Sequence, residues 1–263
     1  MILFTGSGAL SEAFAKQFKC QIISARTLDD AQLTEWLKKA TVVIHNAAAI
    51  QADSLGAFVE ANFGLTKWIL DLIFLLNPNI RFFNISSMSL LHDADTYLSP
   101  DKMTDYAFSK FLSELYCQKH PLSINHQNVV NIRFSTLFYA DAARDGLSKL
   151  GFDAVKNKKI TLINQGIALR DFIPIHVAAA YLKKLTERSF LPSILNIASG
   201  QPLNFKHFAD LILKHDPSVK MDNIAMPTQN VLCDFSTTAL EHLGKITFDM
   251  DAVFETYLKE ITT

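Results

Sequence analysis

The chain has 263 residues, of which 49% are hydrophobic and 19% are charged, and its net charge is −1. This composition indicates a folded globular protein with ample material for a core, and it excludes a disordered chain. The chain has no basic block and no interleaving of basic with aromatic residues, which argues against a nucleic-acid-binding protein.

The cysteines and the apolar segments indicate the compartment in which the protein is expected. The cysteines, Cys20, Cys117 and Cys233, are odd in number and far apart, so they favour a reducing compartment and predict neither a disulfide framework nor a metal site. The apolar start Met1–Thr5 lacks the basic flank of a signal peptide, and the apolar stretch Trp68–Leu76 is too short for a membrane span. We therefore expect a soluble, cytoplasmic protein without a membrane or nucleic-acid partner.

Apolar runs alternate with segments of helical periodicity over the first 135 residues. This alternation predicts an α/β fold: a Rossmann-like, doubly wound parallel sheet with helices on both faces, followed by a small α/β C-terminal part. The expected strands are Met1–Thr5, Cys20–Ser24, Thr41–Asn46, Ile80–Ile85, Val129–Arg133, Lys159–Ile163 and Ile194–Ala198. The expected helices are Leu10–Phe18, Asp29–Lys39, Ala57–Leu76, the segment around Tyr106, Gly146–Asn157, His176–Glu187, Phe205–Lys214, Thr237–Leu243 and Asp251–Ile261.

The first strand runs into a glycine turn that opens a helix. Residues 6–11 fit G-x-G-x-x-G, with Ser11 in the place of the third glycine. Backbone N–H groups at such a helix start can bind a pyrophosphate, and the missing side chains let it approach. The turn therefore predicts a dinucleotide site that includes Gly6, Ser7, Gly8, Ala9 and Leu10.

Two further segments border this expected site. The second strand is followed by Arg26, where an acidic residue would hold a ribose hydroxyl, and an arginine there favours the 2′-phosphate of NADP. An ordinary surface arginine is the alternative. The third strand ends in Asn46, Ala47 and Ala48, whose small side chains let a cofactor lie against the backbone at the carboxyl end of the strand.

Lys110 lies four positions after Tyr106, so the two residues lie on one face of a helix. A nearby ammonium lowers the pKa of a tyrosine, which could then exchange a proton with a sugar or alcohol oxygen. A surface pair on an amphipathic helix is the plain alternative for an isolated motif of this kind. Here Ser86 and Ser87 precede it at the end of a strand, where a hydroxyl could bind the same oxygen.

Several segments, in order along nearly the whole chain, resemble the extended short-chain dehydrogenase/reductase family, in its NAD-dependent epimerase/dehydratase branch. Asn62 lies where that family has an asparagine opening its long helix. The other matching segments are Thr5-Gly-Ser-Gly8, Val43-Ile-His-Asn-Ala-Ala48, Phe83-Asn-Ile-Ser-Ser87, Tyr106-Ala-Phe-Ser-Lys110, Arg170-Asp-Phe-Ile173, Leu195-Asn-Ile-Ala-Ser-Gly200 and Asp234-Phe-Ser-Thr-Thr-Ala-Leu240 with Leu243-Gly244.

The resemblance implies a role for each matching residue. Tyr106 would give or take the proton at the sugar oxygen. Lys110 would hold the nicotinamide ribose and lower the tyrosine pKa. Ser87 would bind the same oxygen, with Ser86 as the runner-up, and Arg170 would contact a diphosphate. The implied domains are an NAD(P)-binding domain at 1–138, with return segments at about 167–198, and a small substrate-binding part at 139–166 and 199–263.

The sequence also departs from the family pattern. Arg133-Phe-Ser-Thr136 replaces R-x-x-N, which leaves Ser135 and Thr136 as candidate substrate contacts. The second and third β/α units are compressed and lack the usual acidic contact to the adenosine. These features make the smaller 4-keto-sugar reductases of the family a closer analogue than its full-length epimerases.

The leading hypothesis is therefore an NADP- or NAD-dependent enzyme that acts on a nucleotide-activated sugar, preferably as a 4-keto-sugar reductase. A nucleotide-sugar epimerase or dehydratase that recycles bound NAD is one alternative, and a cofactor-binding sensor or scaffold without turnover is another. A homodimer is expected from the helix 57–76, which is apolar on two sides, and from Phe108, Phe111 and Leu115.

Overall fold

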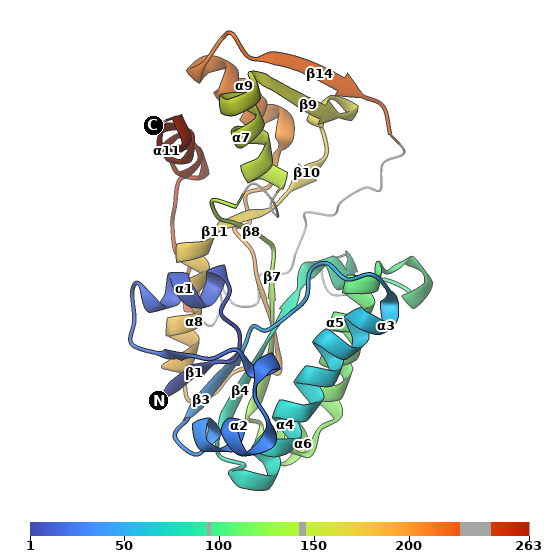
Figure 1. Cartoon of the computed structure of the whole chain (residues 1–263), viewed down its shortest axis with the longest axis vertical. Coiled ribbons are helices and arrows are strands. Elements are labelled where there is room, and N and C mark those ends of the chain that lie inside the picture. Colours follow the sequence, from blue (N-terminus) through green and yellow to red (C-terminus); the bar gives the residue numbers. More distant parts are fainter. Residues whose placement is uncertain (94–95, 142–145, 227–242, 263) are drawn as a thin grey trace.

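The computed structural model of the chain describes residues 1–93, 96–141, 146–226 and 243–262. A six-stranded sheet forms its centre, in the order β2-β1-β3-β4-β7-β12, and all neighbouring strands are parallel (Figure 1). The predicted Rossmann-like fold class is confirmed. The strands are β1 Ile2–Phe4, β2 Gln21–Ile22, β3 Val42–His45, β4 Arg81–Ser87, β7 Val129–Phe134 and β12 Ile194–Ile197.

The strand order places a switch point between β1 and β3. The chain adds β2 on one side of β1 and β3 on the other, and ligands of open α/β sheets bind at the carboxyl edge of such a point. A classical dinucleotide fold has one more strand beyond β2. Here only η1 (Ala25–Thr27) and α2 (Asp30–Leu37) lie between β2 and β3, in agreement with the compression seen in the sequence.

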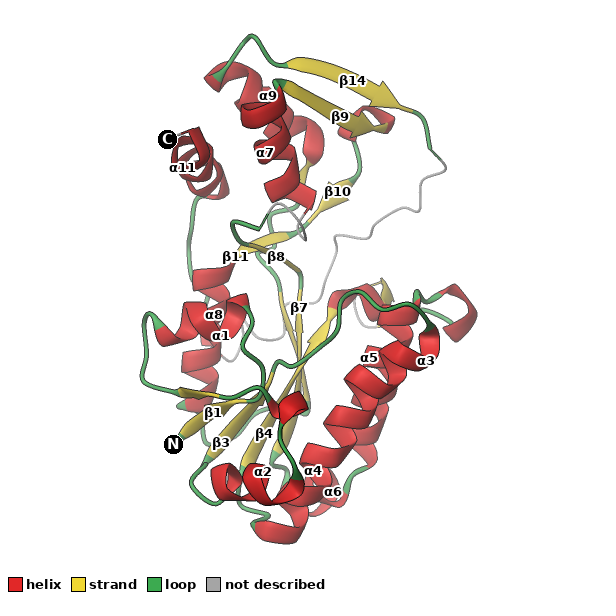
Figure 2. Cartoon of the chain, in the orientation of Figure 1, coloured by secondary structure: helices red, strands yellow, loops and turns green. Residues whose placement is uncertain are grey.

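Helices cover both faces of the sheet (Figure 2). One face carries α1 and α8, and the other carries α2, α4, α5 and α6. The neighbouring residues Phe82 and Phe83 belong to the cores on opposite faces, which is why the strands read as continuous apolar runs. The bounds are α1 Ala9–Ala15, α4 Leu65–Leu76, α5 Asp105–Lys119, α6 Pro121–His126 and α8 Ile175–Thr186.

The long helix predicted over 57–76 contains a π-helical turn. It consists of α3 (Leu55–Phe58), the π turn η2 (Val59–Gly64) and α4. π turns are rare and often occur at functional sites. The buried residues of α4, among them Ile69 and Ile73, face the sheet, whereas Leu75 is 77% exposed.

A second core lies beyond the carboxyl edge of the sheet, in the upper part of Figure 1. It is built on the aromatic residues Phe138, Phe172, Phe208, Phe254 and Tyr257. Its helices and its two-stranded parallel sheet are α7 Gly146–Asn157, α9 Phe205–His215, α11 Met250–Thr262, β9 Lys159–Ile163 and β14 Lys220–Ile224. The expected division into 1–138 with 167–198 and 139–166 with 199–263 stays a prediction.

Short elements complete the described chain. The pair β8–β11 is parallel, and the pairs β10–β13 and β5–β6 are antiparallel. The expected helix Thr237–Leu243 and the segment from Asp234 fall almost wholly outside the described residues, as does Cys233. No helix among the described residues is long and apolar enough to span a membrane. The short elements are β5 Leu91–Asp93, β6 Thr96–Tyr97, β8 Thr136–Phe138, β10 Leu169–Arg170, β11 Phe172–Pro174, β13 Leu203–Asn204, η3 Met88–Leu90, η4 Pro100–Lys102 and η5 Asn164–Gly166.

Candidate functional site

The glycine turn joins β1 to α1 at the switch point. A Cβ atom added to Gly6 would lie 2.8 Å from the Cα atom and 2.9 Å from the nitrogen of Ala47, so the backbones of the two loops meet only because residue 6 is glycine. A Cβ atom added to Gly8 would meet nothing within 4 Å. Gly6 therefore serves the packing of the turn, and Gly8 leaves open space beside it.

Two side chains hold the turn in place. The Asn46 amide accepts a hydrogen bond from the Gly6 nitrogen and donates one to the Gly6 oxygen, both at 2.9 Å. The hydroxyl of Ser11 lies 2.7 Å from the carbonyl oxygens of both Gly6 and Gly8. Serine in the place of the third glycine thus contributes a bond to the turn that glycine could not make.

A pocket of about 370 Å³ opens at this switch point. Most of the residues expected to bind a dinucleotide line it. Ala9 and Leu10 do not, because they form the first turn of α1, where Leu10 packs into the core. The other predicted cofactor residues, Asn62, Ser86, Tyr106 and Lys110, also lie outside this lining. The lining residues are Thr5, Gly6, Ser7, Gly8, Ser24, Arg26, Asn46, Ala47, Ala48, Ala49, Ile50 and Gln51.

Arg26 contributes the positive charge among these lining residues. Its side chain is exposed, and Nη2 donates a hydrogen bond of 3.4 Å to the carbonyl of Ala61. Partial burial of the guanidinium lowers the pKa of Arg26 from its ordinary value. A guanidinium keeps its charge at neutral pH in proteins, so Arg26 remains a cation. The charge stands where the sequence predicts a phosphate contact.

Asn62 was expected at the cofactor, but the structure places its side chain in the protein interior. It is 1% exposed and holds the loop after β3. Its oxygen accepts from the Ala49 nitrogen at 2.6 Å, and its amino group donates to the Ala49 oxygen at 3.0 Å and to the Ser109 hydroxyl at 2.9 Å. The Ser109 hydroxyl in turn donates to the Tyr106 carbonyl at 2.8 Å. Asn62 therefore connects the pocket wall to the helix of Tyr106.

A buried histidine, which the sequence did not single out, continues this connection. Thr66 donates to the Asn62 carbonyl at 2.7 Å, so Nε2 of His45 must be the donor to Thr66 at 3.0 Å. Nδ1 of His45 then accepts from Thr5 at 2.8 Å. Burial lowers the pKa of His45 to about 3, and the charges of Lys110 and Arg26 act in the same direction. His45 is therefore a neutral link between the glycine turn and η2.

Tyr106 and Lys110 lie in the first part of α5, whose N-cap residue Thr104 accepts a hydrogen bond from the Ala107 nitrogen. Lys110 is 2% exposed, and its ammonium has no hydrogen-bond or ion-pair partner within the described residues. Burial lowers the pKa of Lys110 to about 8, while the charge of Glu114 opposes the shift. A buried ammonium without a partner is costly unless a ligand completes it.

The pKa of Tyr106 differs from the sequence-based expectation. Burial raises it to about 12, the Ser87 hydroxyl lowers it, and Tyr139 raises it further. The expected lowering by Lys110 is therefore wrong for this structure, because burial of the phenol is the larger effect. The influence of Ser87 indicates that the hydroxyl and the phenol are neighbours, although these residues are 19 positions apart in the sequence.

The two serines at the end of β4 occupy different surroundings. Ser86 is 5% exposed, lies in register with Arg133, and has no hydrogen-bond partner for its hydroxyl among the described residues. Ser87 is half-buried and caps η3, where its oxygen accepts from the Ser89 nitrogen at 3.1 Å. Its hydroxyl also lies 2.9 Å from that of Ser89, and when Ser87 is the donor in this bond its oxygen keeps a lone pair for a ligand.

The candidate substrate residues Ser135, Thr136 and Arg170 lie on the segments that leave the sheet toward the upper core. The Ser135 hydroxyl is buried without a partner among the described residues, and the Thr136 nitrogen donates to the Asp171 carbonyl at 3.1 Å. Arg170 is half-buried on β10, and no hydrogen bond or ion pair engages its guanidinium within the described part of the chain. Arg170 is therefore a cation on β10 without a protein partner among the described residues.

Asp171, the neighbour of Arg170, has a structural role that the sequence did not reveal. It is 2% exposed and accepts from the Ser199 nitrogen, the Ser199 hydroxyl and the Gly200 nitrogen at 2.6–2.9 Å. Gly200 adopts a φ of +69° in the same turn. The carboxylate thus fixes the turn after β12 against β11.

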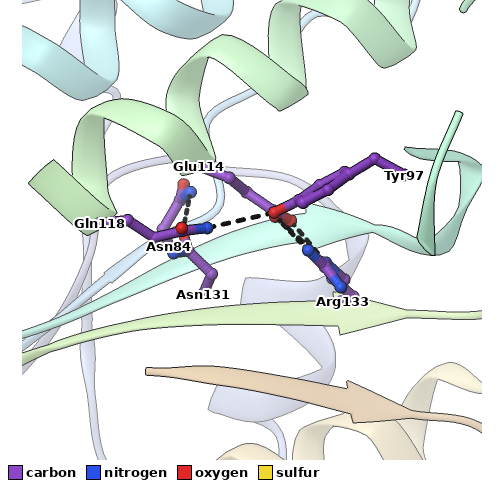
Figure 3. A network of polar contacts seen from close by, with 6 residues as sticks. All are labelled: Asn84, Tyr97, Glu114, Gln118, Asn131 and Arg133. Atoms are coloured by element: carbon purple, nitrogen blue, oxygen red, sulfur yellow. Dashed lines mark hydrogen bonds and ion pairs between the residues drawn. The ribbon is translucent and has the colours of Figure 1, made fainter. Parts of the chain in front are cut away.

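A buried ion pair joins α5 to β7 (Figure 3). Glu114, on α5, is fully buried and binds Arg133 of β7, with Nη2 2.6 Å from Oε2. The Tyr97 hydroxyl donates to the same Oε2 at 2.7 Å. The sequence offered one signal for this pair: an arginine inside the apolar run Val129–Phe134 needs a buried partner.

Comparison with solved structures shows the same fold. The Helicobacter pylori ADP-L-glycero-D-manno-heptose-6-epimerase has a TM-score of 0.80 at 17% identity, covering 99% of this chain and 95% of that one. The Bacillus cereus UDP-glucuronic acid 4-epimerase in complex with NAD has a TM-score of 0.79 at 17% identity, with coverages of 99% and 95%. RMD from Pseudomonas aeruginosa, complexed with NADPH, has a TM-score of 0.78 at 14% identity, with coverages of 100% and 99%.

Comparison at the level of sequence gives the family. No protein with a curated description matches the chain. The family model described as "NAD dependent epimerase/dehydratase family" matches residues 4–198, which is more than half of the chain and includes the glycine turn, Ser87, Tyr106, Lys110 and Arg170. The match confirms the resemblance seen in the sequence and, with it, an enzyme family that uses NAD(P). The chain belongs to the NAD-dependent epimerase/dehydratase family, of the extended short-chain dehydrogenase/reductase type.

Proposed function

We propose that the protein catalyses an NAD(P)-dependent reaction on a nucleotide-activated sugar, and that its preferred reaction is the reduction of a 4-keto sugar. The observation that carries this proposal is the grouping of Ser87 and Tyr106, whose hydroxyls are neighbours, with the buried Lys110, which has no partner among the described residues and interacts electrostatically with Arg26 of the pocket wall. Similar structures include a sugar-nucleotide epimerase in complex with NAD and a protein complexed with NADPH, which supports the same classes of substrate and cofactor here.

The residues present fit a dinucleotide. The open space beside Gly8 suits the approach of a pyrophosphate to the backbone, and the pocket wall at Ala47 and Ala48 is small. The buried ammonium of Lys110 would bind the ribose hydroxyls, and Ser86 offers a second buried group that still lacks a partner among the described residues. When bound, NAD(P) would supply or accept the hydride.

The protonation state of Tyr106 favours the reductive direction. With a pKa raised to about 12 by burial, the phenol holds its proton at neutral pH. A protonated phenol can donate to a carbonyl oxygen that gains negative charge during reduction, whereas an oxidation would first need it as a base. In this proposal Tyr106 donates the proton and Ser87 binds the same oxygen.

Substrate binding is assigned to the segments that lead to the upper core. We infer that Arg170, whose guanidinium has no partner within the described part of the chain, contacts the diphosphate, because a guanidinium binds phosphate through paired N–H groups. Ser135 and Thr136 would contact the sugar, since they replace the family asparagine and lie at the same edge of the sheet. Arg26 would bind the 2′-phosphate of NADP.

The first test is a fluorescence titration with NADPH and, separately, NADH. Tighter binding of NADPH supports Arg26 as a phosphate contact, and Arg26→Ala should then lose that preference while NADH affinity stays within about twofold. Co-purified NAD or a preference for NADH would favour an epimerase or dehydratase. Binding of neither cofactor would favour the scaffold alternative.

Turnover is tested with a panel of UDP-, dTDP- and GDP-linked 4-keto-6-deoxy sugars and the corresponding 4-hydroxy sugars. For a sugar that the wild type reduces, Tyr106→Phe should lower kcat by at least roughly 100-fold and leave NADPH affinity unchanged. Tyr116→Phe is the matched control, because Tyr116 is on the same helix and its hydroxyl binds Asp71. Full turnover by Tyr106→Phe would overturn the proposed role of the phenol.

A homodimer is proposed on separate grounds. The outer end of α4 exposes Phe74, Leu75 and Leu76, and the neighbouring helix α5 carries the half-buried Phe108 and Phe111. Apolar side chains that remain partly or largely exposed on two packed helices suit contact with a second copy of the chain. Light scattering at micromolar concentration should give the mass of a dimer, and Leu75→Glu should shift it toward a monomer.

A further inference from the structure

Glu114 lies one helical turn beyond Lys110, on the same face of α5. The two side chains are 0% and 2% exposed. Opposite charges at i and i+4 ordinarily attract each other, and burial increases the attraction. Both residues are within the described part of the chain, yet no hydrogen bond or ion pair joins them. Something must therefore hold the carboxylate away from the ammonium.

The partners of Glu114 provide that explanation. Nε of Arg133 lies 2.9 Å from Oε1 and 3.1 Å from Oε2, and Nη2 lies 2.6 Å from Oε2. The Tyr97 hydroxyl adds a bond of 2.7 Å to Oε2, and the guanidinium stacks 4.7 Å from the centre of the Tyr97 ring. Gln118 donates to the Tyr97 oxygen at 3.1 Å. Figure 3 shows the carboxylate where the Tyr97 hydroxyl and the Arg133 guanidinium meet.

We propose that Arg133 and Tyr97 are positioning residues: by occupying the Glu114 carboxylate, they keep the Lys110 ammonium free to bind a ligand. This inference rests on the proposed function only in taking Lys110 as a ligand contact. It gives a role to Arg133, the buried arginine of the segment Arg133-Phe-Ser-Thr136 that replaces R-x-x-N of the family. It also connects the β5–β6 segment, which carries Tyr97, to the helix of Tyr106 and Lys110.

The charges around Lys110 indicate what would happen without these partners. Glu114 and Cys117 face it from α5, Arg26 from η1 and His45 from β3. His45 is neutral, burial raises the pKa of Cys117 so that the thiol is uncharged, and Arg26 repels the ammonium. Glu114 is thus the one attractive charge among these neighbours. If Arg133 were removed, the buried ammonium of Lys110, one helical turn away on α5, would be available to the Glu114 carboxylate.

The ionisation of Lys110 in the cofactor-free protein measures this competition directly. Lysine labelled with 13C at Cε gives one NMR signal for each residue, and Lys110→Arg identifies the signal of Lys110. In the wild type it should titrate well below the other lysines. Tyr97→Phe should raise the midpoint by about half a pH unit and Arg133→Leu by about one unit or more, because Glu114 then turns toward the ammonium.

A double variant and a control separate the effect from general damage. Glu114→Gln combined with Arg133→Leu removes both charges, so the midpoint should return to the wild-type value or below. Tyr116→Phe should leave it unchanged. The dissociation constant for NADPH should rise about threefold in Tyr97→Phe and tenfold in Arg133→Leu.

The outcomes that overturn the inference are definite. A Lys110 midpoint unchanged in Tyr97→Phe and in folded Arg133→Leu would refute it. If Arg133→Leu does not fold, Tyr97→Phe against the Tyr116→Phe control decides. The NMR titration needs neither cofactor nor substrate. A failure of the proposed function would therefore appear as absent turnover with the shifts intact, and a failure of this inference as absent shifts with turnover intact.

Discussion

Replacing each of the first two glycines of the turn by alanine separates packing from ligand binding. In Gly6→Ala the new methyl group would lie 2.8–2.9 Å from backbone atoms of Ala47, which cannot rotate away. Overpacking of this kind costs about 1–3 kcal/mol, and the hydrogen bonds between Asn46 and the Gly6 peptide would also be distorted. Gly8 has φ −101° and ψ 176°, which alanine adopts freely, and its methyl group would meet nothing within 4 Å.

The assays are urea unfolding and NADPH titration on both variants. Gly6→Ala should lower the free energy of unfolding by about 1–3 kcal/mol. Gly8→Ala should leave it unchanged or raise it by up to about 1 kcal/mol, and should weaken NADPH binding at least tenfold, or about 1.4 kcal/mol. A wild-type unfolding midpoint for Gly6→Ala would contradict the packing role. Wild-type NADPH affinity for Gly8→Ala would show that no phosphate approaches that residue.

Three other predictions concern buried polar groups. Burial holds the pKa of His45 at about 3, below its ordinary value of 6.5, so His45 is neutral in the folded protein. Its contribution to the free energy of unfolding is complete above pH 6.5 and falls by roughly 2–3 kcal/mol at about pH 4.5, because the unfolded chain then binds a proton that the folded chain does not. Urea unfolding should therefore show a smaller loss of stability at low pH in His45→Gln than in the wild type. Asp171→Ala should cost roughly 2–3 kcal/mol in thermal or urea unfolding, since three donors of the turn after β12 lose their acceptor; an unfolding midpoint equal to that of the wild type would argue against this. Arg133→Leu should lower the free energy of unfolding by about 3–5 kcal/mol, and the double variant with Glu114→Gln by clearly less, because only the single change leaves a buried charge unpaired. Equal losses of stability in the two variants would contradict this.

The strands of the central sheet were predictable because they are buried on both faces. A strand such as Val129–Phe134 reads as a continuous apolar run, and glycine or polar residues mark where it ends. The strand β14 gave no such signal, since all five of its residues are exposed and buried residues do not alternate with exposed ones along it. The pair β5–β6 escaped for a related reason: its segments have two or three residues each, too few for a period to emerge.

The candidate site was predictable where a motif is local and not where its partners are distant. The glycine turn and the Tyr106–Lys110 spacing are contained in single segments. Asn62 was found from its place in the family pattern, but its partner Ser109 lies 47 residues away and only the fold brings them together. The direction of the Tyr106 pKa shift was missed for the same reason, because spacing reveals a neighbouring charge and does not reveal burial.

The interface between the sheet and α5 is polar where most such interfaces are apolar. His45, Asn84 and Asn131 lie in register across three strands, and Lys110 and Glu114 are buried above this face of the sheet. Replacing a buried ion pair by well-packed apolar residues is often neutral or stabilising, so folding stability does not require such a layer. The layer instead fixes Tyr106 through Ser109 and Asn62, and it engages Glu114 so that Lys110 keeps no protein partner within the described residues. A layer that stability does not demand, and that leaves the buried Lys110 ammonium without a partner among the described residues, is best explained by the ligand that we propose for Lys110.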